Sequence, residues 1–218
     1  MIHINSCEMG FVGSICYVVH DDNKNGFMVD PGDSNDSLIS FLKDEKIDLK
    51  YIILTHGHGD HIGGIDSVKE VYPNAKIIAH RDEKELLNDP EQNMSRAVCR
   101  RRISMDADMY IGDGETLSVG EAELKFIHTP GHSKGSMCIL MKDTEEKDTE
   151  GNVILFSGDT LFHQSIGRTD FYGGDFNTIS NSIKNKLYIL PDETIVLPGH
   201  MSPTTIGDEK RYNPFVKA

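Results

Sequence analysis

The sequence contains few cysteines and no tryptophan, and its cysteines do not form a recognisable motif. The four of them, Cys7, Cys16, Cys99 and Cys138, include no pair with C-x-x-C spacing. So few and so widely spaced cysteines argue against a disulfide framework and are typical of free thiols in a reducing compartment. We therefore expect a cytoplasmic protein.

Long apolar runs are also absent. No stretch approaches the length that crosses a membrane, and residues 1–6 lack the charged and then apolar pattern of a secretory leader. Basic residues are scarce, with 22 Lys and Arg against 35 Asp and Glu, which gives a net charge of −13. An acidic chain of this kind disfavours polyanionic partners. We expect neither a nucleic acid nor a membrane as its partner, and the oligomeric state stays open.

What the sequence does contain is an ordinary globular composition, with 38% hydrophobic and 26% charged residues. A length of 218 residues fits one large domain, and no Ser/Pro-rich linker interrupts it. We therefore predict one domain over residues 1–218. Short apolar strands alternate with amphipathic helices, which predicts an α/β layered fold. The charged insert at residues 142–150 predicts the tip of a hairpin.

Potential metal ligands are concentrated in one short stretch, Thr55-His56-Gly57-His58-Gly59-Asp60-His61. It directly follows the apolar run 51–54, which is typical of a buried strand. Ligands on one helix face would lie three or four positions apart, so this H-x-H-x-D-H spacing predicts a loop. Three imidazoles and one carboxylate suit Zn(II), Mn(II) or Fe(II) better than Ca(II) or Mg(II). The alternative is a His-rich surface turn.

Three further candidates follow apolar strands in the same way. His132 comes after the strand predicted at 124–127, Asp159 after that at 153–156, and His200 after that at 195–197. Each of these strands runs into a small or rigid turn before its polar residue. Strand ends that meet at one edge of a sheet would bring these side chains to the His-rich loop. The repeated pattern favours a metal site over a surface turn.

The ligand order, residues 56–61 followed by His132, Asp159 and His200, resembles that of the metallo-β-lactamase fold superfamily. Within it, the segments 129–132, 165–171 and 204–207 are similar to those of short glyoxalase II-like hydrolases, the hydroxyacylglutathione hydrolase type. The resemblance covers nearly the whole chain. It implies a single-domain, four-layer αββα sandwich with the metals at one edge.

The resemblance also implies a ligand set for two divalent metal ions. One ion would be held by His56, His58 and His132, and the other by Asp60, His61 and His200, with Asp159 bridging both. Zinc is favoured, while iron and manganese are compatible with the same donors. Metal binding lowers the pKa of water to about 7, so a bridging hydroxide would exist at neutral pH. Asp60 would orient this hydroxide as the catalytic residue.

The implied reaction is hydrolysis of a small-molecule thioester of the hydroxyacylglutathione type. A thiolate leaves readily because a free thiol has a pKa of about 8.5, so no strong general acid is needed. Long glyoxalase II enzymes add a helical C-terminal domain with glutathione-binding cations, whereas 18 residues (218 − 200) follow His200 here. The thiol carrier therefore stays open. Asp159 stands where common zinc β-lactamases often have Cys, which disfavours antibiotic cleavage.

Two alternatives remain at this stage. Persulfide dioxygenases also resemble the chain, through the segment 167–171, and use one iron that here would be held by His56, His132 and Asp159. A weaker alternative is a non-catalytic or redox metal-binding module, as in diiron proteins that join this fold to a flavin domain.

Two basic features have open roles. Arg168 and Asp170 predict either a buried ion pair that holds the loop or, for Arg168, a contact with a substrate carboxylate; we favour the ion pair. The basic stretch 96–102 predicts either a solvated helix face or a flap whose arginines meet an anionic substrate.

Overall fold

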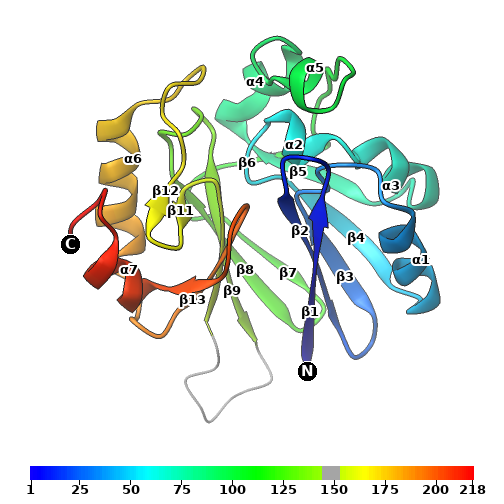
Figure 1. The fold of residues 1–218 in the computed structure, drawn as a ribbon. Coiled ribbons are helices and arrows are strands. Elements are labelled where there is room, and N and C mark those ends of the chain that lie inside the picture. Colours follow the sequence, from blue (N-terminus) through cyan, green and yellow to red (C-terminus); the bar gives the residue numbers. More distant parts are fainter. Residues whose placement is uncertain (144–152) are drawn as a thin grey trace.

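Two six-stranded sheets face each other at the centre of the protein (Figure 1). The structure is a computed structural model, and it describes residues 1–143 and 153–218. The first sheet has the order β1 (Ile2–Met9), β2 (Ser14–Asp21), β3 (Asn25–Val29), β4 (Asp48–Ile53), β5 (Lys76–His80), β6 (Met109–Ile111). The second has the order β14 (Thr204–Thr205), β13 (Ile195–Pro198), β10 (Ile154–Gly158), β9 (Met137–Asp143), β8 (Ala122–His128), β7 (Thr116–Val119).

Helices cover the outer face of each sheet (Figure 1). α1 (Asp36–Asp44) and α3 (Ile65–Val71) lie outside the first sheet, and α6 (Phe176–Ser182) and α7 (Ile206–Tyr212) lie outside the second. Short elements fill the connections: α2 (Gly59–Ile62), η1 (Arg81–Glu83), α4 (Lys84–Asn88), α5 (Ser95–Val98), and the small ribbon of β11 (Leu161–Phe162) and β12 (Ser165–Ile166). This arrangement is the predicted αββα sandwich.

The two faces of the first sheet are both buried, and this explains its apolar strands. Along β2, Cys16 and Val18 pack toward the helices, while Tyr17 and Val19 pack toward the second sheet. Successive side chains of a strand point to opposite faces, so a strand buried on both faces reads as a continuous apolar run. Between the sheets, Phe156 is fully buried with its ring centroid 5.3 Å from that of Tyr17.

Strand direction brings the candidate ligands to one edge. In the first sheet β3, β4, β5 and β6 run parallel, so their carboxyl ends meet at the same edge. In the second sheet β10 is parallel to β13, and β8 has the same direction because both β8 and β10 pair antiparallel with β9. At this edge the backbone N–H of Met137 donates to the carbonyl of Thr55 at 2.9 Å, and that of Ile15 to Gly199 at 2.7 Å. These bonds join the two sheets beside the candidate site.

The predicted elements differ from the observed ones at two helices. The apolar spacing from Ile62 to Tyr72 suggests one helix, but α2 ends at Ile62 and α3 begins at Ile65. A side chain at Gly63 or Gly64 would collide with the carbonyl of Gly32 or Asp33, so the chain bends where these backbones touch. The apolar stripe over residues 175–190 predicts a second long helix, which is observed as α6 followed by a π-helical turn, η2 (Ile183–Leu187).

Strand β1 is not among the strands predicted from the sequence. It is half-exposed and polar, so it lacks the apolar run that marks the other strands.

The predicted hairpin tip at 142–150 lies almost entirely outside the described residues. Within residues 1–143 and 153–218, no helix combines the length and apolarity needed to cross a membrane.

The inter-sheet core gives the first prediction. Phe156→Ala should lower the free energy of unfolding by about 3–5 kcal/mol, because it removes a buried ring and leaves a cavity between two rigid sheets. Phe11, which is 68% exposed, provides the control, and Phe11→Ala should change stability by at most about 0.5 kcal/mol. Urea denaturation would measure both. Equal effects of the two substitutions would contradict the assigned core.

Candidate metal centre

The structure brings all seven predicted ligands to one pocket at the shared strand edge. Five of them line it: His58, Asp60, His132, Asp159 and His200. The other two, His56 and His61, lie beneath them with exposed fractions of 1% and 0%. Their role as ligands remains a prediction, but the structure places them as the sequence argument requires.

The first group consists of three imidazoles with ring nitrogens close together. The Nε2 atom of His132 lies 2.9 Å from Nδ1 of His58 and 3.3 Å from Nε2 of His56. His56 and His58 come from the loop after β4, and His132 comes from the loop after β8 on the other sheet. Three imidazole nitrogens that converge in this way form a donor set suited to a divalent transition metal.

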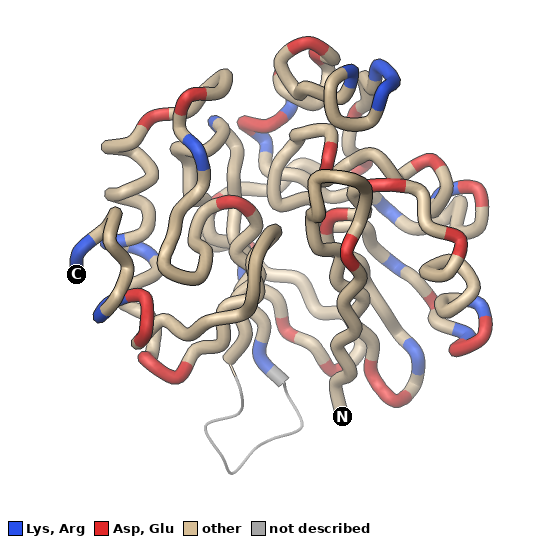
Figure 2. Tube along the Cα trace, in the orientation of Figure 1, with Lys and Arg blue, Asp and Glu red and all other residues tan. Residues whose placement is uncertain are grey.

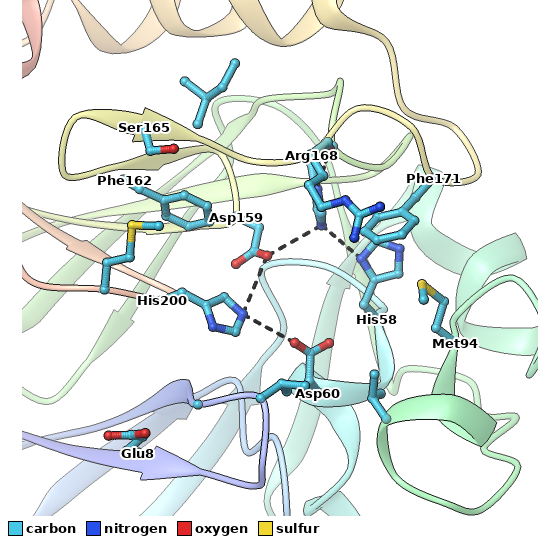
Figure 3. Close-up of a pocket in the computed structure, with 16 residues that line it drawn as sticks. Glu8, His58, Asp60, Met94, Asp159, Phe162, Ser165, Arg168, Phe171 and His200 are labelled. Atoms are coloured by element: carbon cyan, nitrogen blue, oxygen red, sulfur yellow. Dashed lines mark hydrogen bonds and ion pairs between the residues drawn. The ribbon is translucent and has the colours of Figure 1, made fainter. Parts of the chain in front are cut away.

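The second group contains Asp60, His61 and His200, again with donor atoms facing one another. Nε2 of His200 lies 3.3 Å from Oδ2 of Asp60, and Nε2 of His61 lies 3.7 Å from the same oxygen. Figure 3 shows Asp60 next to His200 and joined to it by a dashed line, with Asp159 above them.

Asp159 lies between the two groups. Its Oδ2 atom is 3.7 Å from Nε2 of His132 in the first group and 3.7 Å from Nε2 of His200 in the second. Its Oδ1 atom is 3.4 Å from Nε2 of His61. One carboxylate therefore faces both sets of imidazoles, which is the position that a bridging ligand requires.

Buried donor atoms without partners show that the residues fit a metal. Among the described residues, Nε2 of His61 and Oδ1 of Asp159 are buried and have no hydrogen-bond partner. Unpaired polar atoms are costly in a protein interior. A cation between these two atoms would satisfy both, so the arrangement suits a metal better than an apolar filling.

The electrostatics of the site differ between its two halves. Burial lowers the pKa of His56 well below its ordinary value, and the neighbouring imidazoles add to this effect. Burial would also lower the pKa of His61, yet the carboxylates of Asp159, Asp60 and Asp30 raise it to about 10. The first half thus presents neutral nitrogens, while the second half retains positive charge. A metal that binds His61 displaces its proton, so uptake should weaken as the pH falls.

Asp30 also supports the site, although it is not among the candidates predicted from the sequence. Its carboxylate accepts hydrogen bonds from the backbone N–H of Thr55 at 2.8 Å and from the Thr55 hydroxyl at 2.5 Å. Nδ1 of His61 lies 2.9 Å from Oδ2 of Asp30, which leaves Nε2 of that ring to face the site. Asp30 follows β3 directly, just as the predicted ligands follow their strands. That position was the signal that could have identified it.

Glu83 is a second overlooked support. It is fully buried, and its two oxygens accept the backbone N–H groups of Gly57 at 2.8 Å and Gly135 at 2.6 Å. Gly57 lies between His56 and His58, and Gly135 lies in the loop that carries His132. Burial raises the pKa of Glu83 to about 7 against the effect of these hydrogen bonds. One side chain therefore holds together the two loops that form the first group. No sequence pattern marked it.

The Arg168 segment supports the site mainly through its backbone. Nδ1 of His132 lies 2.8 Å from the carbonyl oxygen of Arg168, so this ring presents Nε2 to the site. The predicted ion pair is present, with Nε and Nη2 of Arg168 at 2.9 and 2.7 Å from the Asp170 carboxylate. It is not buried as expected, because both side chains are about two-thirds exposed. Its charges stay in water because the loop lies at the pocket rim.

The arginines of the basic stretch 96–102 do not line the pocket. Arg101 pairs with Asp66 at 2.7 Å, and Arg102 pairs with Glu91 at 2.9 Å. The same part of the chain contributes Met94 and Val98 to the pocket wall. The observed placement favours the solvated surface over an arginine flap.

Comparisons with known proteins agree with this geometry. A family model described as the metallo-beta-lactamase superfamily matches residues 9–200. Hydroxyacylglutathione hydrolase GloC of Haemophilus influenzae is 34% identical, over 93% of this chain and 92% of that protein.

Two solved structures extend the comparison. BLEG-1, a B3 metallo-beta-lactamase, has a TM-score of 0.87 and 38% identity, covering 99% of this chain and 100% of its own. TTHA1623, solved in a di-iron-bound form, has a TM-score of 0.79 and 29% identity, covering 97% and 100%.

The support from Glu83 gives the second prediction. Glu83→Ala should destabilise the fold by about 2–5 kcal/mol, because it leaves two buried N–H groups without an acceptor. It should also weaken metal binding, since the loops of His56 and His132 lose their common anchor. Urea denaturation and a competitive zinc titration would measure the two effects.

The neighbouring Glu85 serves as the control, because its exposed carboxylate pairs with Lys134 and Tyr172 at the surface. Glu85→Ala should leave both quantities nearly unchanged. A Glu83→Ala protein with normal stability and normal zinc affinity would contradict the anchoring role.

Proposed function

Because this chain belongs to the metallo-beta-lactamase superfamily, we propose that it is a dinuclear metal-dependent hydrolase that cleaves a small-molecule thioester. The observation that supports this proposal most strongly is the shared position of Asp159. The carboxylate faces His132 in one donor group and both His61 and His200 in the other. This shared position supports two ions rather than one.

Divalent ions held there, with zinc favoured and iron or manganese compatible, would supply Lewis acidity and a water molecule activated at neutral pH. The protein's own residues would hold these ions and orient the water molecule. The imidazoles of His56, His58 and His132 would supply neutral donors, and Asp60 would accept a hydrogen bond from the attacking water and orient it. This role of Asp60 fits its place at the cavity floor beside His200.

The composition of the pocket favours a leaving group that needs no proton. Its volume is about 680 Å³, and its described lining includes no lysine, tyrosine or cysteine that could act as a general acid. A thiolate departs without protonation because the pKa of a thiol is about 8.5. The name of the GloC relative, a hydroxyacylglutathione hydrolase, supports the same reaction class.

A β-lactam is a second candidate substrate, since BLEG-1 is described as a B3 metallo-beta-lactamase and is 38% identical. Opening a lactam produces an amine leaving group that must be protonated. Apart from Glu8 and the predicted metal ligands, the described lining holds no group that could protonate this amine, which favours the thioester. A chromogenic cephalosporin belongs in the substrate panel for this reason.

The third prediction tests the reaction. Zinc- or manganese-loaded protein should release free thiol from S-lactoylglutathione or a simpler acyl thioester without oxygen. The dioxygenase alternative needs only His56, His132 and Asp159 with one iron, and it consumes dissolved oxygen. Thiol release in an anaerobic chamber, with thiol-free buffer as the blank, separates the two. Oxygen uptake with a persulfide, together with no thiol release from any thioester, would reject the hydrolase.

The fourth prediction tests the metal number. Metal-replete wild-type protein should hold two ions per chain. Asp159→Ala should abolish turnover and lower metal content more than His200→Ala, because it removes a donor from both groups. Elemental analysis of gel-filtered protein would measure this, with circular dichroism as the folding control. Wild-type metal content in the Asp159→Ala protein would exclude a bridging role.

A further inference from the structure

We infer that the pocket selects thioesters whose arms are apolar and carry no negative charge, and that Glu8 at the rim excludes anionic thiol carriers. This inference rests on the proposed thioester hydrolysis and specifies its substrate class. It is drawn from the charge and polarity of the cavity around the ligands.

The walls of the pocket are apolar on several sides. Phe162 and Ile166 from the β11–β12 ribbon form one side, and Met94 and Val98 form the side next to α5. Figure 3 shows Phe162 beside His200 and Met94 beside His58, so apolar surface flanks the candidate metal ligands on both sides. The arms of a bound thioester would therefore contact mainly hydrocarbon, with Glu8, Ser165 and Arg168 as the polar lining side chains other than the candidate ligands.

Apolar side chains continue to the mouth of the pocket. Met201, which follows His200, is 56% exposed and lines the cavity, and Val12 of the β1–β2 loop is 38% exposed and also lines it. Met201 has a φ of +70°, a left-handed backbone conformation that costs free energy for residues other than glycine. Large apolar side chains exposed around a cavity are typical of a site that receives an apolar ligand.

The pocket offers little to an anion beyond its metals. Arg168 is the single Lys or Arg in its described lining. Its guanidinium is held by two hydrogen bonds to Asp170 and lies 4.1 Å from the centroid of the Phe171 ring. Two of its N–H groups are thus committed to Asp170, and that carboxylate offsets the positive charge that Arg168 presents to a substrate anion. The lysines and arginines of the chain lie mostly elsewhere, with one group in the loop next to α5 (Figure 2).

Glu8 adds a negative charge to the rim. It is the penultimate residue of β1, and its side chain lies along the β1–β2 loop, where a Cβ at Gly13 would be 3.0 Å from Oε1. Figure 3 shows it below His200, on the far side from Arg168. A carboxylate at the entrance repels anionic ligands, and the net charge of −13 acts in the same direction.

The decisive experiment uses two substrates that differ in charge and by one methyl group. These are the S-butyryl thioesters of 3-mercaptopropionate, an anion, and of its methyl ester, which is neutral. Metal-replete wild-type protein should show a kcat/KM at least about tenfold higher for the neutral substrate, expressed mainly through KM. S-butyrylglutathione, which is also an anion, should show a similarly low kcat/KM.

Variants at the rim then test Glu8 itself. Glu8→Gln should reduce the preference for the neutral substrate, and Glu8→Lys should reduce it further or reverse it. In both variants the cause should be a lower KM for the anionic substrate. Glu70, an exposed carboxylate of α3 that does not line the pocket, is the matched control. Glu70→Lys makes the same change in net charge and should leave the preference as in wild type. A shift of equal size in both lysine variants would assign the effect to the overall charge and reject the role of Glu8.

The outcomes separate this inference from the proposed function. If both thioesters are hydrolysed and the anion is equally good or better, the charge selection is wrong while thioester hydrolysis stands. If neither these nor any other thioester is hydrolysed, the proposed function fails, and the inference fails with it.

Discussion

The constraint on which this structure depends is the burial of many potential metal ligands in one place. Imidazoles and carboxylates are costly to remove from water unless each polar atom has a partner. Asp30 and Glu83 provide such partners on the protein side, by fixing one imidazole and the two loops of the first group. The unpaired atoms of His61 and Asp159 face each other across the site, where a cation would be their partner.

The two sheets explain why this burial is possible. Each contributes strands that run in the same direction toward one edge, so ligands distant in sequence emerge next to one another. Close backbone contacts then set the distances between the candidate ligands. A Cβ at Gly199 would lie 2.5 Å from Oδ1 of Asp159, so only glycine lets the loop before His200 pass this close to the bridging position. The rigid sandwich thus determines the spacing of donors that the loops alone would leave variable.

The same edge of the sandwich carries both the metal donors and the apolar rim, and the two have different origins. The donors end long buried strands and are held by buried hydrogen bonds. The rim comes from surface segments, namely the β1–β2 loop, the β11–β12 ribbon and the α5 region. Changes in these segments could alter the substrate without disturbing the donors. The candidate ligands and the apolar rim therefore come from different segments of the chain.

The sequence alone indicated an α/β layered fold with candidate ligands after its strands, because buried strands read as apolar runs. Its resemblance to the metallo-β-lactamase superfamily implied the αββα sandwich and the set of seven ligands. It could not reveal Asp30 or Glu83 as supports, since their partners lie 25 to 52 positions away in the chain. Nor could it show that the Arg168 pair is exposed. Such features depend on which loops meet at the sheet edge and on which side chains stay accessible to water there. Only the packing of the two sheets decides those contacts.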